Sequence, residues 1–169
     1  MTRLIVIRPI VTSPIVMRQI VMRQVVMRLI LLFGLVLGAV AARAAPPAPS
    51  HDIVVQVDNP SHVGLALNNV ENIYRYYVEK GEPVRIEVVA FGPGLVMLRA
   101  DTSPVKARVH HIAEEGLGRI VFSACNNTLH GMERAEGHKI AIVPDARIVP
   151  SGAVRITELE HSGWSYLTP

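Results

Sequence analysis

The order of apolar and polar positions predicts alternating strands and helices between residues 51 and 169. Short apolar stretches bounded by turn residues predict strands at 51–57, 84–91, 119–124, 146–149 and 164–167. Helical spacing and capping residues predict helices at 60–80, 95–100, 103–116, 126–137 and 153–161. Residues 138–143 fit either a strand or an irregular connection. Strands that alternate with helices indicate an α/β fold, with a mostly parallel sheet of about five strands covered by helices on both faces.

The turns that leave the predicted strands carry capping residues. Asn59 is placed to cap the first helix, with Pro60 at its first position. Asn126 or Asn127 is placed to cap the helix that follows the third strand. Ligands of open parallel sheets bind beyond the carboxyl ends of the strands. A ligand site is therefore expected among the turns at 58–59, 92–94, 125–127 and 150–152.

Residues 5–29 repeat with a period of five: IVIRP, IVTSP, IVMRQ, IVMRQ, VVMRL. This period matches neither a helix nor a strand and would scatter the arginines around any regular element. One interpretation is a genuine cationic extension. The other is a translation start placed too far upstream, so that residues 1–26 are not part of the natural protein. We favour the second, because Met27 begins a well-formed signal sequence.

Residues 27–44 have the order of a secretory signal peptide. Met-Arg is followed by the apolar run LILLFGLVLGAV and then by small residues, with a cleavage site expected after Ala44. The apolar run is shorter than the roughly 20 residues of a transmembrane helix, so we expect no stable membrane span after cleavage. Residues 45–50 then form a Pro-rich leader, and the domain at 51–169 is expected in the periplasm or outside the cell.

The charge of the chain is unevenly distributed. The formal net charge is +3, but the first 44 residues hold six arginines and no acidic residue. The other 11 basic residues face all 14 acidic ones, and 11 − 14 gives a net charge of −3 for the rest of the chain. Because nucleic-acid binding needs a clustered basic surface, we expect no nucleic-acid partner.

Four stretches carry motifs in a distinctive order: LALNNVENI, VVAFGPGLVMLRADTSPV, FSACNNTL and IVPSGAVRITELEHSGWSYL. The most specific pieces are GPG after the second strand, Cys-Asn-Asn-Thr after the third, and VPSG before the last helix. In this order they resemble the DsrE/DsrF-like family, over almost the whole of 51–169. The resemblance implies a three-layer α/β/α sandwich that assembles into trimers or hexamers. In sulfur-relay members a cysteine in a matching place carries persulfide sulfur between partners, and Cys125 is the residue here that matches it.

Cys125 is the only cysteine of the chain and the candidate catalytic residue. Between the end of a strand and the start of a helix, free backbone amides and the helix dipole would stabilise its thiolate. A thiolate can attack a sulfane sulfur and hold it as a persulfide. The alternative is a buried cysteine that packs as a small apolar residue.

The candidate ligand-binding residues lie in the same turns and are Gly92, Gly94, Asn126, Asn127, Ser151 and Gly152. Glycines let a backbone approach a ligand closely, and they equally serve tight turns with positive φ. The asparagines could donate hydrogen bonds into the site or cap the helix. His130, on the helix after Cys125, is a further candidate base.

No metal or cofactor is expected. The seven histidines show no ligand spacing typical of zinc, and no Gly-x-Ser-x-Gly or P-loop motif is present.

Three interpretations of the function are open. One is an exported sulfur carrier that acts at Cys125 with a sulfur donor or acceptor protein, rather than a turnover enzyme. The alternative is a non-catalytic small-molecule or protein-binding module on the same fold. A structural role, in which apolar helix faces mediate assembly into an oligomer, is the third interpretation.

Overall fold

The computed structural model describes residues 18–19, 21–28 and 50–169. The chain divides into two compact units, residues 1–47 and residues 48–169. In the first unit, residues 18–19 and 21–28 are helical, although a period of five does not match that of a helix. The reason is that helical hydrogen bonds are local, whereas a period of five affects only how side chains are distributed around the helix. The part of the predicted signal peptide beyond Arg28 and the predicted Pro-rich leader before Ser50 lie outside the described residues.

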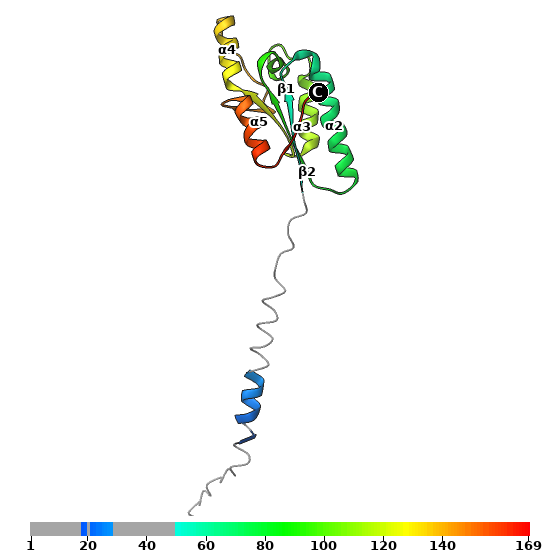
Figure 1. Ribbon diagram of the computed structural model, residues 1–169, viewed down its shortest axis with the longest axis vertical. Helices are drawn as coiled ribbons and strands as arrows, with labels where there is room; N and C mark the ends of the chain where they lie inside the picture. Colours follow the sequence, from blue (N-terminus) through cyan, green and yellow to red (C-terminus); the bar gives the residue numbers. More distant parts are fainter. Residues whose placement is uncertain (1–17, 20, 29–49) are drawn as a thin grey trace, which may run out of the picture. The chain divides into compact units, whose positions relative to one another are not determined.

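The second unit is built on a parallel sheet of five strands (Figure 1). The strands are β1 (His51–Val57), β2 (Val84–Ala90), β3 (Ile120–Cys125), β4 (Ala146–Val149) and β5 (Ser165–Leu167). Their order across the sheet is β4-β3-β2-β1-β5, and every neighbouring pair is parallel. The predicted α/β fold with about five strands is therefore confirmed. Every strand runs in one direction, so all the carboxyl ends meet at one edge of the sheet.

Helices cover both faces of the sheet, which gives three layers. The helical elements are η1 (Pro60–His62), α2 (Val63–Glu79), η2 (Gly92–Leu98), α3 (Lys106–Gly116), α4 (Asn126–Glu136) and α5 (Gly152–His161). α2 and α3 pack on one face and form the larger core with residues such as Val55, Ile86 and Phe122. α5 packs on the other face, where Val54 and Val89 meet Ile156 and Leu159.

The local signals at the ends of elements explain most of the boundaries. Asn59 caps η1, since its side-chain oxygen accepts the N–H of Ser61 at 3.0 Å, with Pro60 at the first position. Gly81 has φ +69° just after α2, as expected for a residue that ends a helix. The GPG sequence lies inside η2, a 3-10 helix that continues to Leu98. Residues 138–143 are irregular apart from an isolated bridge between Ile142 and Arg99.

Leu117 ends α3 in a conformation that costs stability. Its φ is +47°, in the left-handed region, and its side chain is 79% exposed. Leu117→Gly should raise the free energy of unfolding by about 1 kcal/mol, because glycine adopts this conformation without the Cβ clash. Urea denaturation followed by circular dichroism measures the change. Leu117→Ala keeps the Cβ and serves as control, and equal stability of the two variants would contradict the prediction.

Candidate functional site

The turns after β2, β3 and β4 come together at the carboxyl edge of the sheet. β2, β3 and β4 are neighbours in the sheet, so Cys125, which ends β3, is brought close to Gly92 and Gly152, which follow β2 and β4. The backbone N–H of Gly92 donates to Oγ1 of Thr128 in α4 at 2.9 Å. The backbone N–H of Gly152 faces the sulfur of Cys125. Three of the four turns predicted to form a site thus lie together at this end of the sheet.

Cys125 ends β3 and is the N-cap residue of α4. Its side chain is on the same face of the sheet as that of Ser123, because residues two apart on one strand share a face. This is the face that α5 covers. The residue is only 4% exposed. The prediction placed a thiol at a strand end and a helix start, and the structure has it there. A sulfur donor would have to reach this atom, and the residue is largely covered.

The surroundings of the sulfur favour its ionised form. Burial raises the pKa of the Cys125 thiol, but four nearby polar groups outweigh it and the pKa is lowered overall. These groups are the hydroxyl of Thr128 and the backbone N–H groups of Gly152, Thr128 and Asn127. They come from the first turns of α4 and α5, where N–H groups have no partner within the helix. The cysteine is buried, yet its sulfur faces polar donors.

Asn126 and Asn127 do not cap the helix, which corrects the expectation for this turn. They are the first two residues of α4, and no side chain caps this helix. The cause is that β3 continues through Cys125, one residue beyond its predicted end, and the helix begins immediately afterwards. Asn127 contributes its backbone N–H to the surroundings of the sulfur. Its side chain is exposed, and that of Asn126 is half-buried.

The glycines of η2 lie close to other parts of the domain. Gly94 is buried, and its N–H donates to the carbonyl oxygen of Asp58 at 2.9 Å. A Cβ on Gly94 would lie 2.5 Å from the carbonyl oxygen of Val57. Gly92 has φ +51° and uses its N–H on Thr128. Both amides therefore donate within the domain, which favours the turn interpretation of these glycines.

Ser151 and Gly152 start α5. The Ser151 hydroxyl accepts the N–H of Val154 at 3.5 Å, so it caps the helix. A Cβ on Gly152 would lie 3.0 Å from Cβ and Cδ1 of Phe91. The absence of a side chain thus lets the first turn of α5 pack against Phe91 at the end of β2. This close packing brings the Gly152 N–H to Cys125.

A buried ion network lies on the same face of the sheet. Glu87, in the middle of β2, is 2% exposed and accepts hydrogen bonds from Ser123, Arg155 and Arg147. Oε1 of Glu87 is 2.7 Å from Ser123 Oγ, and Oε2 is 2.7 Å from Nη2 of each arginine. Burial raises the pKa of Glu87, but these bonds outweigh it and lower the pKa to about 2. We did not predict this network. The sequence feature that could have indicated it is a glutamate within the apolar strand VRIEVVA.

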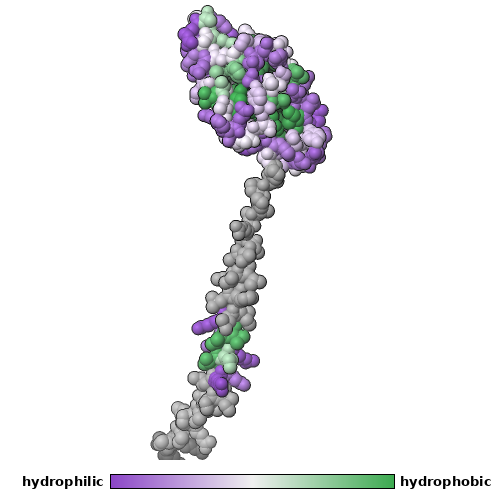
Figure 2. Space-filling model, in the orientation of Figure 1, coloured by the Kyte–Doolittle hydropathy of each residue, from purple (hydrophilic) through white to green (hydrophobic). Residues whose placement is uncertain are grey.

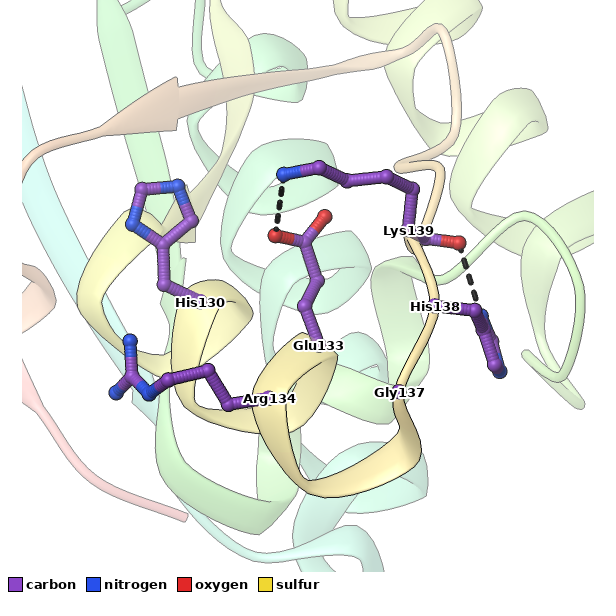
Figure 3. A pocket seen from close by; sticks show the side chains of 6 residues that line it. All are labelled: His130, Glu133, Arg134, Gly137, His138 and Lys139. Atoms are coloured by element: carbon purple, nitrogen blue, oxygen red, sulfur yellow. Dashed lines mark hydrogen bonds and ion pairs between the residues drawn. The ribbon is translucent and has the colours of Figure 1, made fainter.

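An open hollow of about 520 Å³ lies along α4 and the segment after it (Figure 3). His130, Glu133 and Arg134 line it from the helix, and the ammonium of Lys139 points to Glu133 at 3.0 Å. The ring of His138 points away from that pair. His130, the candidate base, lies in this hollow, whose lining does not include Cys125.

Within residues 18–19, 21–28 and 50–169, no group of three or more His, Cys, Asp or Glu side chains is placed to hold a metal ion. In the same part of the chain, no helix is long and apolar enough to cross a membrane.

Among solved structures, the chain matches a protein of unknown function, MTH1491 from Methanobacterium thermoautotrophicum. The two share 33% sequence identity with a TM-score of 0.58, and the match covers 69% of this chain and 97% of MTH1491. No protein-family model matches the chain, and no curated protein matches it. With this identity over almost the whole length of the relative, the chain belongs to the same family as MTH1491.

Proposed function

We propose that the domain is a sulfur carrier that holds sulfane sulfur on Cys125 as a persulfide. The observation that carries the proposal is the convergence of polar donors from α4 and α5 on one buried sulfur, with the resulting lowered pKa of the thiol. Thiolate is the nucleophilic form of cysteine. Motifs that resemble the DsrE/DsrF-like family support the same role, as does the place of Cys125 at the end of the third strand.

The proposed chemistry is a transfer of one sulfur atom. With thiosulfate as donor, the Cys125 thiolate attacks the outer sulfur, the S–S bond of thiosulfate breaks, and sulfite leaves with the bonding electron pair. The product on the protein is a persulfide anion, one of the reversible modifications of cysteine. The same donors that stabilise the thiolate would stabilise this anion, which is also a sulfur-centred negative charge.

Loading with sulfur tests the proposal directly. The full chain is incubated with thiosulfate or a low-molecular-weight persulfide, and its intact mass is measured. We expect wild type to gain the mass of one sulfur atom, with the gain reversed by a thiol reductant. Cys125→Ser, which removes the only thiol of the chain, should gain nothing. An unchanged mass of wild type, or an equal gain in Cys125→Ser, would reject the sulfur-carrier proposal.

A second candidate is a non-catalytic binding module, and the small exposed fraction of Cys125 favours it. In that case the cysteine packs the start of α4, and its ionisation has no function. Cys125→Ser would then leave ligand binding unchanged, whereas a sulfur carrier would lose its cargo.

Export and assembly complete the proposal. The signal-like residues 27–44 would deliver the domain to the periplasm or the exterior. The face in Figure 2 shows apolar groups between larger polar areas. Ile148, on the outer strand β4, and Val154, in α5, are 54% and 55% exposed. We propose that such exposed residues contribute to a trimer or hexamer, which light scattering on the purified chain would detect.

A further inference from the structure

The connection from β4 to α5 crosses the end of β3 at the level of Cys125. In the sheet, β3 lies between β2 and β4. Cys125 pairs with Val149, the last residue of β4, and the pairing of β2 with β3, continued by one residue, places Phe91 on its other side. Gly152, which starts α5, packs against Phe91. The chain between Val149 and Gly152 therefore passes from one side of Cys125 to the other and covers it.

The segment that covers Cys125 is held by few apolar contacts. α5 contributes the buried side chains Ile156 and Leu159 to a small cluster, whose other buried members are Val54 and Val89. β5, which follows α5, pairs with β1 over three residues, of which two are exposed and one is half-buried. α2 and α3, on the opposite face, belong to a much larger cluster. Segments with few buried apolar contacts open at a lower free energy than the whole molecule unfolds.

One buried ion pair fastens α5 to the sheet. Arg155, in the first turns of α5, donates from Nε to Oε1 of Glu87 at 2.9 Å and from Nη2 to Oε2 at 2.7 Å. Glu87 is 2% exposed and belongs to β2, the middle strand of the sheet. A pair of an arginine and a carboxylate with two bonds combines strength with a fixed geometry. This pair has to break before α5 can leave the sheet.

Glu87 also has partners that do not belong to α5. Ser123 donates to its Oε1 at 2.7 Å, and Nη2 of Arg147 is 2.7 Å from its Oε2. These two residues are on the strands β3 and β4. A buried carboxylate that loses its only partner is costly. Because Arg147 remains as a counter-ion, the bond to α5 can break while the buried charge stays paired.

We propose that the C-terminal segment 152–167, made of α5 and β5, is a lid over Cys125 that is latched by the Arg155–Glu87 ion pair and hinged at the connection after β4. In the closed state the segment covers the sulfur. Opening breaks the latch and uncovers the end of β3. In its purpose the inference rests on the proposed function, since a sulfur donor would reach Cys125 in the open state; the opening itself does not depend on sulfur chemistry.

Hydrogen exchange measured by mass spectrometry on the full chain tests the lid. Arg155→Met keeps the length of the side chain and removes the latch, while Glu87 retains its other partners. We expect amide exchange in 152–167 to become about tenfold faster, as for the loss of one hydrogen bond to a charged group, with exchange in α2 and α3 unchanged. Alkylation of Cys125 by iodoacetamide, a neutral probe, should accelerate by the same factor. Loss of a nearby cation would by itself disfavour the thiolate and slow this reaction, so an acceleration reports access.

Arg108→Met is the matched control. Arg108, on α3, makes the same kind of two-bonded pair with Glu71 of α2, and these helices cover the opposite face of the sheet. This variant should leave exchange in 152–167 and alkylation as in wild type. Should Arg155→Met fail to fold, Arg155→Lys replaces the two-bonded pair by a single charge and should give a smaller acceleration in the same direction.

Low concentrations of urea separate the lid from global unfolding. Opening of a short segment exposes little surface, so its equilibrium responds weakly to denaturant, whereas that of global unfolding responds strongly. Wild-type alkylation should therefore vary little with urea well below the unfolding transition.

The lid is rejected if Arg155→Met exchanges and reacts like wild type, if Arg108→Met accelerates both measurements equally, or if wild-type alkylation follows global unfolding in urea. Alkylation of native wild type as fast as that of the unfolded chain would also reject it, because the cysteine would then have no cover. None of these measurements uses a sulfur donor. A protein that opens but takes up no sulfur keeps the lid and loses the carrier proposal, and one that loads sulfur without responding to Arg155 does the reverse.

Discussion

Gly94→Ala is expected to destabilise the domain by about 3 kcal/mol, through overpacking against backbone that is held in place. An added Cβ would lie 2.5 Å from the carbonyl oxygen of Val57, 2.8 Å from its carbonyl carbon and 2.9 Å from that of Asp58. Two of these atoms belong to the last residue of β1 and the third to the residue that follows it. This strand is held on both sides, by β2 and β5, and Val57 is fully buried. Relief would need a displacement of η2, with loss of the hydrogen bond from Gly94 to Asp58.

Gly131→Ala is the matched control for this prediction. Gly131 is inside α4, and a Cβ there would meet no atom within 4 Å. This substitution should stabilise the domain by about 0.5 to 1 kcal/mol, because alanine is the better helix former. Chemical denaturation measures both variants. If Gly94→Ala unfolds at the same denaturant concentration as wild type, the close approach of η2 to β1 is not a constraint on the fold.

Glu87→Gln is expected to cost about 3 kcal/mol of unfolding free energy at neutral pH. The amide keeps the size of the side chain but leaves the guanidinium groups of Arg155 and Arg147 without their buried carboxylate. The lowered pKa of Glu87 corresponds to a free energy of the same size. A pKa of about 2 against an ordinary value of 4.5 is a difference of about 2.5 units, or about 3 kcal/mol.

The sign of this pKa shift sets the pH range of the effect. Because the folded-state pKa is the lower one, the contribution of Glu87 is complete above about pH 4.5 and is lost as the pH falls towards about 2. The stability difference between wild type and Glu87→Gln should therefore shrink over this range. Glu158→Gln removes an exposed carboxylate 3.9 Å from Arg155 and should change stability by less than about 0.5 kcal/mol. A difference for Glu87→Gln that is equally small, or independent of pH, would contradict the prediction.

The fold could be predicted because its signals are local. Alternating apolar stretches and turn residues placed every strand within two residues of its bounds, and Asn59 with Pro60 marked the first helical turn correctly. The cap expected at Asn126 or Asn127 was wrong because the end of a strand is decided by its neighbours. Cys125 still pairs with Val149 of β4, so β3 extends into the turn.

The site was predictable only in part, because its other members are distant in sequence. The position of Cys125 followed from the order of strands and helices. The amide of Gly152 reaches the sulfur only because α5 packs tightly against Phe91, a contact that no spacing along the chain reveals. Thr128 was missed for a related reason. Its partner Gly92 is 36 residues away, and a threonine near a helix start has an ordinary local explanation.

The strand order also has a consequence for synthesis of the protein. β1 is made first but lies inside the sheet, where its outer side pairs with β5, from more than a hundred residues later in the chain (Figure 1). Until residues 165–167 have left the ribosome, the backbone of β1 presents an open hydrogen-bonding edge to other chains. Unpaired edges of this kind promote aggregation of nascent proteins. The three residues of β5 thus protect the first strand of the domain, and chains that stop before them are expected to be captured by chaperones or to aggregate.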